Sequence, residues 1–280
     1  MQLIDDTYLR DLLARPALPE YTARLWNRRY FIRAQARSKA LQTGRGTYLG
    51  RAWIVLSPMV RVALYALVFG VVLKISKGME NFVGFLMIGV TYYGFFTKGN
   101  MAGSNLLRSS RGLISAFSFP KAALVISRSY QGVIDGLPPI VVGTIGAVLT
   151  QLKFSFNWEI IFLPLIFALM VAFTTGITFI VARLSAFAPD VGQVIGWINM
   201  CLFFLSGVFY SLDRYATAPV LREIMFLNPI YQFLTAARQC VLLGIIPSLN
   251  TWAYLTFWSF GLLIVGYVFF WKAEERYASA

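Results

Sequence analysis

The chain has 280 residues, of which 58% are hydrophobic and only 13% are charged, and its mean hydropathy is +0.65. Charged residues make up about 25% of an ordinary soluble domain, so this composition excludes a soluble globular protein and indicates an integral membrane protein. The formal net charge is +13. The basic residues lie mainly in segments that border apolar stretches, which argues against a nucleic-acid-binding protein.

Residues 1–52 form a basic segment before the first apolar stretch. The segment lacks the apolar core of a signal peptide, so we expect no cleavable leader. A helical projection of residues 20–41 places Trp26 and Tyr30 on an apolar side, opposite Arg29 and Arg33. An arginine-rich helix with an aromatic face is typical of helices that lie in the lipid headgroup layer. The alternative is that this helix only anchors the topology.

Six apolar stretches are long enough to cross a bilayer, at residues 53–73, 82–106, 122–150, 161–182, 191–210 and 252–271. A spanning helix needs about 20 residues, and continuous rather than alternating hydrophobicity favours helices over a barrel. The predicted fold is therefore an all-α integral membrane protein with a transmembrane domain at 53–272 and a short tail at 273–280. Lys and Arg recur in alternate loops, which predicts six spans with both termini in the cytoplasm.

The third stretch contains Asp135, followed by Pro138 and Pro139. Proline removes a backbone donor and clashes with the preceding turn, so we expect this helix to be kinked or split. An intramembrane carboxylate is costly and is usually paired, and Lys98 or Arg128 could supply the opposite charge. Structural pairing and a direct role in transport both remain open.

Residues 211–250 form a long segment between the fifth and sixth stretches. Part of it is apolar without being long enough to cross, and Asn228-Pro229 marks a boundary between two short helices. We expect a re-entrant helix pair that dips into the outer leaflet, because irregular backbone at that depth needs protein or a water-filled cavity around it.

Several kinds of chemistry are missing from the sequence. The chain has no histidine, the commonest general base, and no Gly-Lys dipeptide, so a phosphate-binding loop of the Walker type is impossible. We expect no catalytic residue, metal or cofactor, and read Cys201 and Cys240 as small apolar residues. Active transport would therefore need energy from another subunit.

Aromatic side chains are abundant in the apolar stretches. The faces of sugar rings stack on aromatic faces, and Tyr hydroxyls add hydrogen bonds, so such residues suit a carbohydrate path. Lipid contact and interfacial belts are the alternative. The candidate path residues are Tyr65, Phe69, Tyr92, Tyr93, Phe96, Phe203, Phe204, Phe209 and Tyr210.

Three local patterns occur in order along the chain: Tyr48-Leu49-Gly50-x-x-Trp53-x-x-Leu56-x-Pro58, Arg111-Gly112-Leu113-Ile114 followed by Phe119-Pro120-Lys121, and Asn228-Pro229 followed by Arg238. With these patterns the chain resembles the permease subunit of ABC-2 type exporters, especially those that move lipid-linked polysaccharides such as O antigen, teichoic acid and galactan.

The resemblance implies a homodimer in a bacterial inner membrane, bound to two copies of a separate ATPase that carries the ATP and Mg. Residues 107–121 would form the coupling loop on that ATPase, through Arg108, Arg111, Leu113, Ile114, Phe117 and Phe119. The expected substrate is a polyprenyl-phosphate-linked polysaccharide, with the galactan of an arabinogalactan wall as the specific expectation. An ABC-2 exporter of drugs or lipids, a membrane enzyme of lipid-linked sugar assembly and a passive channel or scaffold are the alternatives.

Overall fold

The computed structural model describes residues 16–43, 46, 48–74, 80–151, 157–211 and 219–278, and all regular elements in these ranges are helical. Four helical segments in this part of the chain are long and apolar enough to cross a membrane: Gly50–Val72, Ala122–Leu149, Trp158–Phe187 and Leu249–Trp271. The described part of the chain is thus all-helical, with four segments that have the length and composition of membrane spans.

The first half of the molecule contains α2 (Leu18–Asn27), α3 (Arg29–Gln42), a 3-10 turn (Gly50–Ala52), α4 (Trp53–Tyr65) with a π-helical continuation (Ala66–Val72), α5 (Phe82–Gly103), α6 (Leu106–Ser109), α7 (Arg111–Ala116) and α8 (Ala122–Leu149). The second half contains a 3-10 turn (Trp158–Phe162), α9 (Leu163–Phe187), α10 (Val191–Leu205), α11 (Pro219–Phe226), α12 (Pro229–Arg238) with a π-helical continuation (Gln239–Leu243), α13 (Leu249–Trp271) and the 3-10 helix η6 (Glu274–Ala278).

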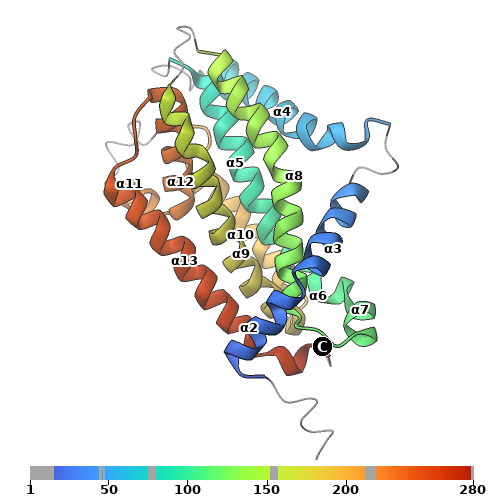
Figure 1. Cartoon of the computed structure of the whole chain (residues 1–280). Helices are drawn as coiled ribbons and strands as arrows, with labels where there is room; N and C mark the ends of the chain where they lie inside the picture. The colour runs from blue at the N-terminus through green and yellow to red at the C-terminus, as the bar shows by residue number, and fades with distance from the viewer. Residues whose placement is uncertain are drawn as a thin grey trace, which may run out of the picture.

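The centre of the molecule is a bundle in which α5 packs on α8 and α9, and α9 packs on α13 (Figure 1). Glycine allows the closest of these contacts. A Cβ atom at Gly176 of α9 would lie 2.4 Å from a backbone carbon of Leu262, and one at Gly266 of α13 would lie 2.3 Å from the Gly176 carbonyl oxygen. Small residues let membrane helices approach at backbone distance, which is how such bundles are held without a hydrophobic driving force.

The third apolar stretch is one uninterrupted helix, because α8 runs through Pro138 and Pro139 without a break. Of the two predicted outcomes, a kink or a split, the split is therefore excluded, and the kink stays a prediction. Packing against α5 holds both sides of the proline pair, since Gly136 sits against the Phe95 ring and Gly143 sits against Thr91. Neighbouring helices commonly stabilise a proline-containing membrane helix in this way.

The basic N-terminal segment forms two helices rather than one, with the break at Arg28. Helix α3 packs along α8 (Figure 1). The buried face consists of Tyr21, Leu25, Ile32, Ala36 and Ala40. Trp26 and Tyr30, which the projection placed on the apolar side of the helix, are 69% and 68% exposed. Trp26 and Tyr30 therefore do not pack against the rest of the described chain, and their place in the headgroup layer stays a prediction.

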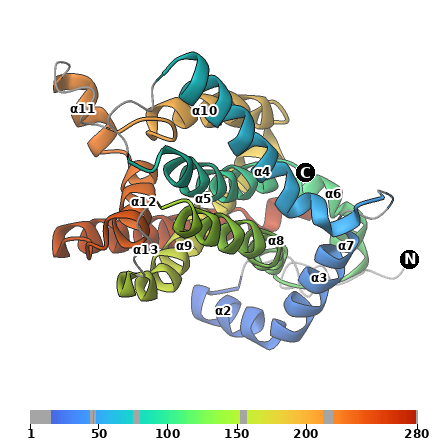
Figure 2. The ribbon, with the colours of Figure 1, turned by 90° about the horizontal axis from the view of Figure 1, so that it is seen from above.

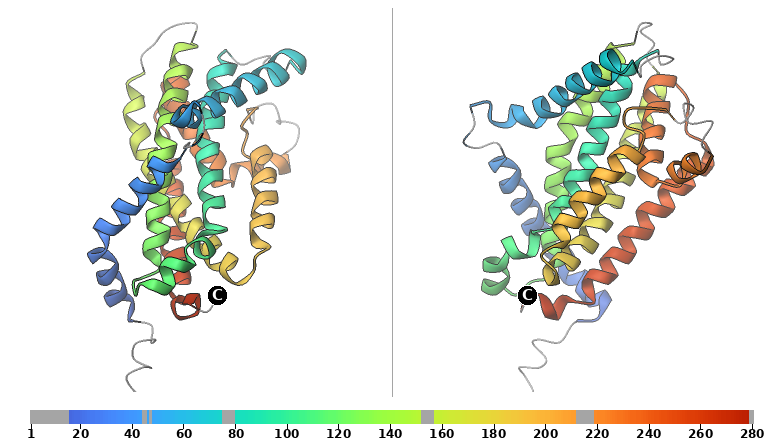
Figure 3. Two further views of the ribbon diagram at one scale, coloured as in Figure 1. Left: turned by 90° about the vertical axis from the view of Figure 1, so that its right-hand side faces the viewer. Right: turned by 180° about the vertical axis from the view of Figure 1, so that it is seen from behind.

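The fifth stretch is shorter than predicted, since α10 ends at Leu205 and the chain turns at Gly207, whose φ of +60° favours glycine. Viewed from above and from two further sides, α10 stands at the periphery of the bundle (Figures 2 and 3). The two short helices expected in the following segment are present as α11 and α12. Asn228 caps α12, because its side-chain oxygen accepts a hydrogen bond of 3.0 Å from the Ile230 amide. Residues 212–218 of this segment lie outside the described residues.

Candidate functional site

Aromatic rings from α4, its π-helical continuation, α5, α10 and the turn after α10 meet in one group. We call this group the aromatic cluster; it consists of Tyr65, Phe69, Tyr93, Phe96, Phe203, Phe204 and Phe209. Phe209 lies at its centre, with ring centroids 4.3 Å from Phe69 and 4.8 Å from Phe203. Seven of the nine predicted path residues are therefore neighbours in space, although they come from three separate stretches of sequence.

The aromatic cluster has a packed side and an open side. Tyr93, Phe96 and Phe209 are buried, whereas Tyr65 is only partly covered and Phe204 is 50% exposed. The buried rings are thus packed in the protein, and the rings of Tyr65 and Phe204 are open to the outside. The open faces can stack against a ring with C–H faces or against lipid.

The other two predicted path residues lie elsewhere. Tyr210 follows the cluster, and its hydroxyl donates a hydrogen bond to the Phe204 carbonyl. Tyr92 is 1% exposed and faces α8 and the end of α12, beside Thr144 and Cys240. Tyr92 is thus a core residue rather than part of the open aromatic surface, because adjacent residues on α5 point about 100° apart.

A polar contact attaches α10 to α5. Asn199 is the only buried residue of α10, and its side-chain oxygen accepts a hydrogen bond of 3.0 Å from the Asn100 amide. The Tyr93 hydroxyl donates to the Asn199 carbonyl. The sequence analysis did not single out Asn100 or Asn199. Each is an amide side chain within an otherwise apolar helix, and such side chains commonly hydrogen-bond across membrane helices. That pattern could have identified them.

Two cavities of about 400 Å³ and about 260 Å³ lie next to each other among the end of α3 and helices α4, α5, α8 and α9. Thr43, Ile54, Phe95 and Lys98 line both of them. We call the pair the basic cavity, because Lys98, Arg128 and Arg61 are among its lining residues and Asp135 is the only carboxylate among the described residues that line it.

Asp135 is held by neutral groups rather than by a direct ion pair. One of its oxygens accepts hydrogen bonds of 3.3 Å from Gln131 and of 3.3 Å from Thr43. Gln131 in turn accepts a hydrogen bond of 2.6 Å from the Arg128 guanidinium. Among the described residues, neither Lys98 nor Arg128 forms an ion pair with Asp135. The expected pairing therefore takes an indirect form, in which Gln131 lies between the two charges.

The predicted coupling loop forms α6 and α7, at the end of the bundle where the C-terminus lies (Figure 1). Leu113, Ile114 and Phe119 pack inward against a second hydrophobic core. Arg108, Arg111 and Phe117 are exposed, with Phe117 at 65%. The loop thus has a packed side and a solvent-exposed side, and the exposed side carries two arginines and a phenyl ring.

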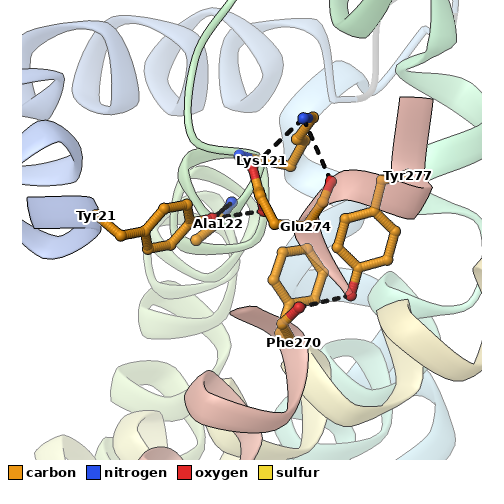
Figure 4. A network of polar contacts seen from close by, with 6 residues as sticks. All are labelled: Tyr21, Lys121, Ala122, Phe270, Glu274 and Tyr277. Atoms are coloured by element: carbon orange, nitrogen blue, oxygen red, sulfur yellow. Dashed lines mark hydrogen bonds and ion pairs between the residues drawn. The ribbon is translucent and has the colours of Figure 1, made fainter. Parts of the chain in front are cut away.

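A buried polar network ties the exit of this loop to both ends of the described chain (Figure 4). The Tyr21 hydroxyl of α2 donates a hydrogen bond of 2.7 Å to Glu274 of η6 and accepts one of 3.1 Å from the Ala122 amide. Glu274 also accepts a hydrogen bond of 2.8 Å from the Lys121 amide, and its carboxylate lies 3.5 Å from the Lys121 ammonium. Burial raises the pKa of Glu274, although the contacts with Lys121 and Tyr21 oppose the shift.

Comparison with known families identifies the class of this fold. A model of the ABC-2 type transporter family matches residues 31–242, which is most of the chain. The chain belongs to the ABC-2 type transporter family. The match begins within α3 and ends within the π-helix after α12, so it includes the aromatic cluster, the basic cavity, α6 and α7.

Curated relatives of this ABC-2 protein are named O-antigen export system permease protein RfbA. The relative from Myxococcus xanthus is 24% identical over 195 residues, which cover 69% of this chain and 72% of the relative. Two from Klebsiella pneumoniae are 22% identical over 240 and 234 residues, and each alignment covers 84% of this chain and 88% of the relative. ABC-2 permeases are membrane transport subunits that work with a separate ATPase, and this chain is a member of that family.

Proposed function

We propose that this ABC-2 permease exports a polyprenyl-phosphate-linked polysaccharide from the cytoplasm to the outer face of a bacterial inner membrane. The single observation that carries the proposal is the aromatic cluster, whose open side offers Tyr65, Phe69, Phe203 and Phe204 to a passing chain. Stacking of about 0.5–1.5 kcal/mol per ring is strong enough to guide sugar rings and weak enough to release them. The names of the relatives support the same substrate class. The galactan of an arabinogalactan wall is our specific substrate proposal.

The proposed topology has six spans with both termini in the cytoplasm. The four long apolar segments supply four crossings. Helix α5 has 22 residues, so at about 1.5 Å per residue it is about 33 Å long, enough for the fifth. Helix α10 and the turn after it supply the sixth. The basic α6–α7 loop lies at the same end of the molecule as α2 and η6, in agreement with the positive-inside rule (Figure 1).

The proposed assembly is a homodimer with two ATPase subunits beneath it, and ATP and Mg are bound on those subunits. The exposed side of α6 and α7 would contact the ATPase through Arg108, Arg111 and Phe117. Helix α2 and α3 would lie between the ATPase and the first span, where Arg29 covers the Tyr30 ring at 4.8 Å and the Trp26 ring at 5.6 Å, with Arg33 exposed beside them. The polymer would thread between the two copies.

Export by a reconstituted system tests this function. Vesicles that contain the permease and its partner ATPase would be loaded with lipid-linked galactan, and polysaccharide on the opposite face would be measured with a galactan-binding lectin. The Tyr65→Ala/Phe69→Ala double variant should slow export several-fold. Phe257→Ala is the matched control, because Phe257 is 72% exposed on α13 and lies outside the aromatic cluster. Equal export by the double variant and the control would contradict an aromatic path.

The volume of the larger cavity favours one rival function, the export of a drug-sized amphiphile. A volume of about 400 Å³ lies in the range of about 300–1,000 Å³ that is typical of small-molecule sites. ATPase stimulation separates the two functions: stimulation by small amphiphiles but not by lipid-linked polysaccharide would favour the rival.

A further inference from the structure

The basic cavity carries more positive than negative charge. Among the described lining residues, three cations, Lys98, Arg128 and Arg61, stand against one carboxylate, Asp135, which leaves an excess of two positive charges. Lys98 is within electrostatic reach of both Arg61 and Asp135. Cations grouped at the depth of membrane helices repel one another and are costly to keep out of water. A site of this kind is stable when an anion neutralises it.

These cations retain unused hydrogen-bond donors. Among the described residues, Lys98 and Arg61 make no hydrogen bond or ion pair, and Arg128 uses one donor, on Gln131. Lys98 and Arg61 are exposed, whereas Arg128 is half-buried. An ammonium offers three donors and a guanidinium five. The remaining donors are therefore available to a ligand within the cavity.

Asp135 acts on Arg128 through Gln131 rather than by direct contact. Gln131 donates to Asp135 and accepts from Arg128, so the carboxylate fixes the amide and the amide fixes the guanidinium. Thr43, at the end of α3, donates to the same Asp135 oxygen. The other Asp135 oxygen is buried without a hydrogen-bond partner. This arrangement makes Asp135 a positioning residue for Arg128.

Two glycines keep the cavity open. A Cβ atom built on Gly94 of α5 or on Gly132 of α8 would meet no heavy atom within 4 Å. Both glycines line the cavity, Gly132 in its larger part and Gly94 in its smaller part. The space beside the cations is therefore large enough to admit a group that the chain itself does not provide.

We propose that the basic cavity binds the phosphate or diphosphate headgroup of a lipid. Lys98 and Arg128 contact the phosphate oxygens, Arg61 contributes charge from α4, and Asp135 orients Arg128. Guanidinium and ammonium groups are the side chains that bind phosphate most strongly, through charge-assisted hydrogen bonds. An excess of two positive charges matches a diphosphate better than it matches a neutral sugar. This inference rests on the proposed function, to which it adds the place where the lipid carrier is held.

Binding to the full-length permease in phosphatidylcholine nanodiscs tests the proposal. The probes are undecaprenyl diphosphate, uncharged undecaprenol and inorganic pyrophosphate, with binding measured by native mass spectrometry and by competition. We expect the wild type to bind undecaprenyl diphosphate and to ignore undecaprenol. Arg128→Gln and Lys98→Gln should each weaken binding on the order of tenfold or more, as the loss of a charge-assisted hydrogen bond implies. Binding to these variants at the wild-type level would overturn the site.

Substitution of Asp135 separates a positioning role from a merely structural one. Asp135→Asn keeps an acceptor for Gln131, so it should retain most of the binding, whereas Asp135→Ala should lose it together with the orientation of Arg128. Equal binding by the two variants would remove Asp135 from the proposal.

A steric variant tests the cavity without altering any charge. Gly132→Leu should block binding by filling the cavity. Gly261→Leu on α13 is its control, because a Cβ atom there also meets no heavy atom within 4 Å and Gly261 does not line the cavity. Unimpaired binding by a folded Gly132→Leu protein would place the ligand elsewhere.

Three further outcomes separate the lipid assignment, the site and the proposed function from one another. If inorganic pyrophosphate binds as tightly as undecaprenyl diphosphate, the ligand of the site is a soluble phosphate compound, and the assignment of a lipid is overturned. If undecaprenyl diphosphate binds and this binding depends on Arg128, but the protein exports no polysaccharide, the proposed function is refuted while the binding site stands. Normal polysaccharide export by a Lys98→Gln/Arg128→Gln protein that no longer binds the lipid would refute a role of the site in export.

Discussion

Tyr21 joins three segments at one end of the bundle, and its removal should destabilise all of them together. Tyr21→Phe deletes the hydroxyl that donates to Glu274 at 2.7 Å and accepts from the Ala122 amide at 3.1 Å. A hydrogen bond to a charged group contributes about 1.5–3 kcal/mol, and a buried amide without a partner costs about 1–3 kcal/mol. Because Tyr21 is only 1% exposed, water does not replace the hydroxyl, and we expect a net loss of about 3 kcal/mol.

Thermal unfolding of the full-length protein in detergent measures this loss. Tyr30→Phe is the matched control, since it makes the same change on the same N-terminal segment at a side chain that is 68% exposed. A loss of about 3 kcal/mol should lower the melting temperature by about 5 °C or more, while the control should be within about 1 °C of the wild type.

The pH dependence of the Tyr21→Phe effect gives a second test. Burial raises the pKa of Glu274, and the hydrogen bond from Tyr21 opposes the shift. Because the folded pKa lies above the unfolded one, ionised Glu274 opposes folding, and this cost disappears as the pH falls through the folded pKa. Tyr21 lessens that cost only while Glu274 is ionised. The difference between wild type and Tyr21→Phe should therefore shrink as the pH is lowered from about 8 to about 5. Equal melting temperatures for Tyr21→Phe and Tyr30→Phe, or a difference that does not change with pH, would refute this account of the network.

Three other changes have defined outcomes. Asn199→Ala should loosen α10, and a double-mutant cycle of unfolding free energies with Asn100→Ala should give a coupling of about 0.6–1.7 kcal/mol; zero coupling would contradict the contact. A spin label on the exposed Cys201 should show increased mobility in Asn199→Ala. Phe117→Ala should leave the melting temperature unchanged and reduce stimulation of the partner ATPase, whereas undiminished stimulation would remove Phe117 from the coupling surface. Glu274→Gln should remove the pH dependence of the Tyr21→Phe effect, which titration of the melting temperatures would detect.

The aromatic cluster shows how far residue types alone predict a site. The sequence identified seven aromatic residues that become neighbours, because rings confined to a few membrane helices have few other places to pack. It could not separate Tyr92 from Tyr93, which differ by one position along α5. Only the neighbours of α5 decide that Tyr93 packs against Phe203 while Tyr92 is enclosed by α8.

Asp135 shows a different limit. The sequence placed Asp135 in a membrane-length apolar stretch and predicted a partner for it. The partners themselves are Gln131, one turn away on the same helix, and Thr43, which is distant in sequence. Thr43 reaches Asp135 because α3 packs along α8, and no local pattern encodes that contact.

Composition and hydrophobic run length by themselves determined that the chain is helical and embedded in a membrane, because an unpaired backbone amide in hydrocarbon is too costly for any other spanning structure. The order of three short motifs indicated the transporter class. The tertiary structure alone decided which faces are buried, that the proline pair leaves α8 unbroken, and that Lys98, Arg128 and Arg61 share one cavity. Those outcomes depend on close approaches at glycines such as Gly136 and Gly176, which fix how the helices pack and therefore which side chains meet.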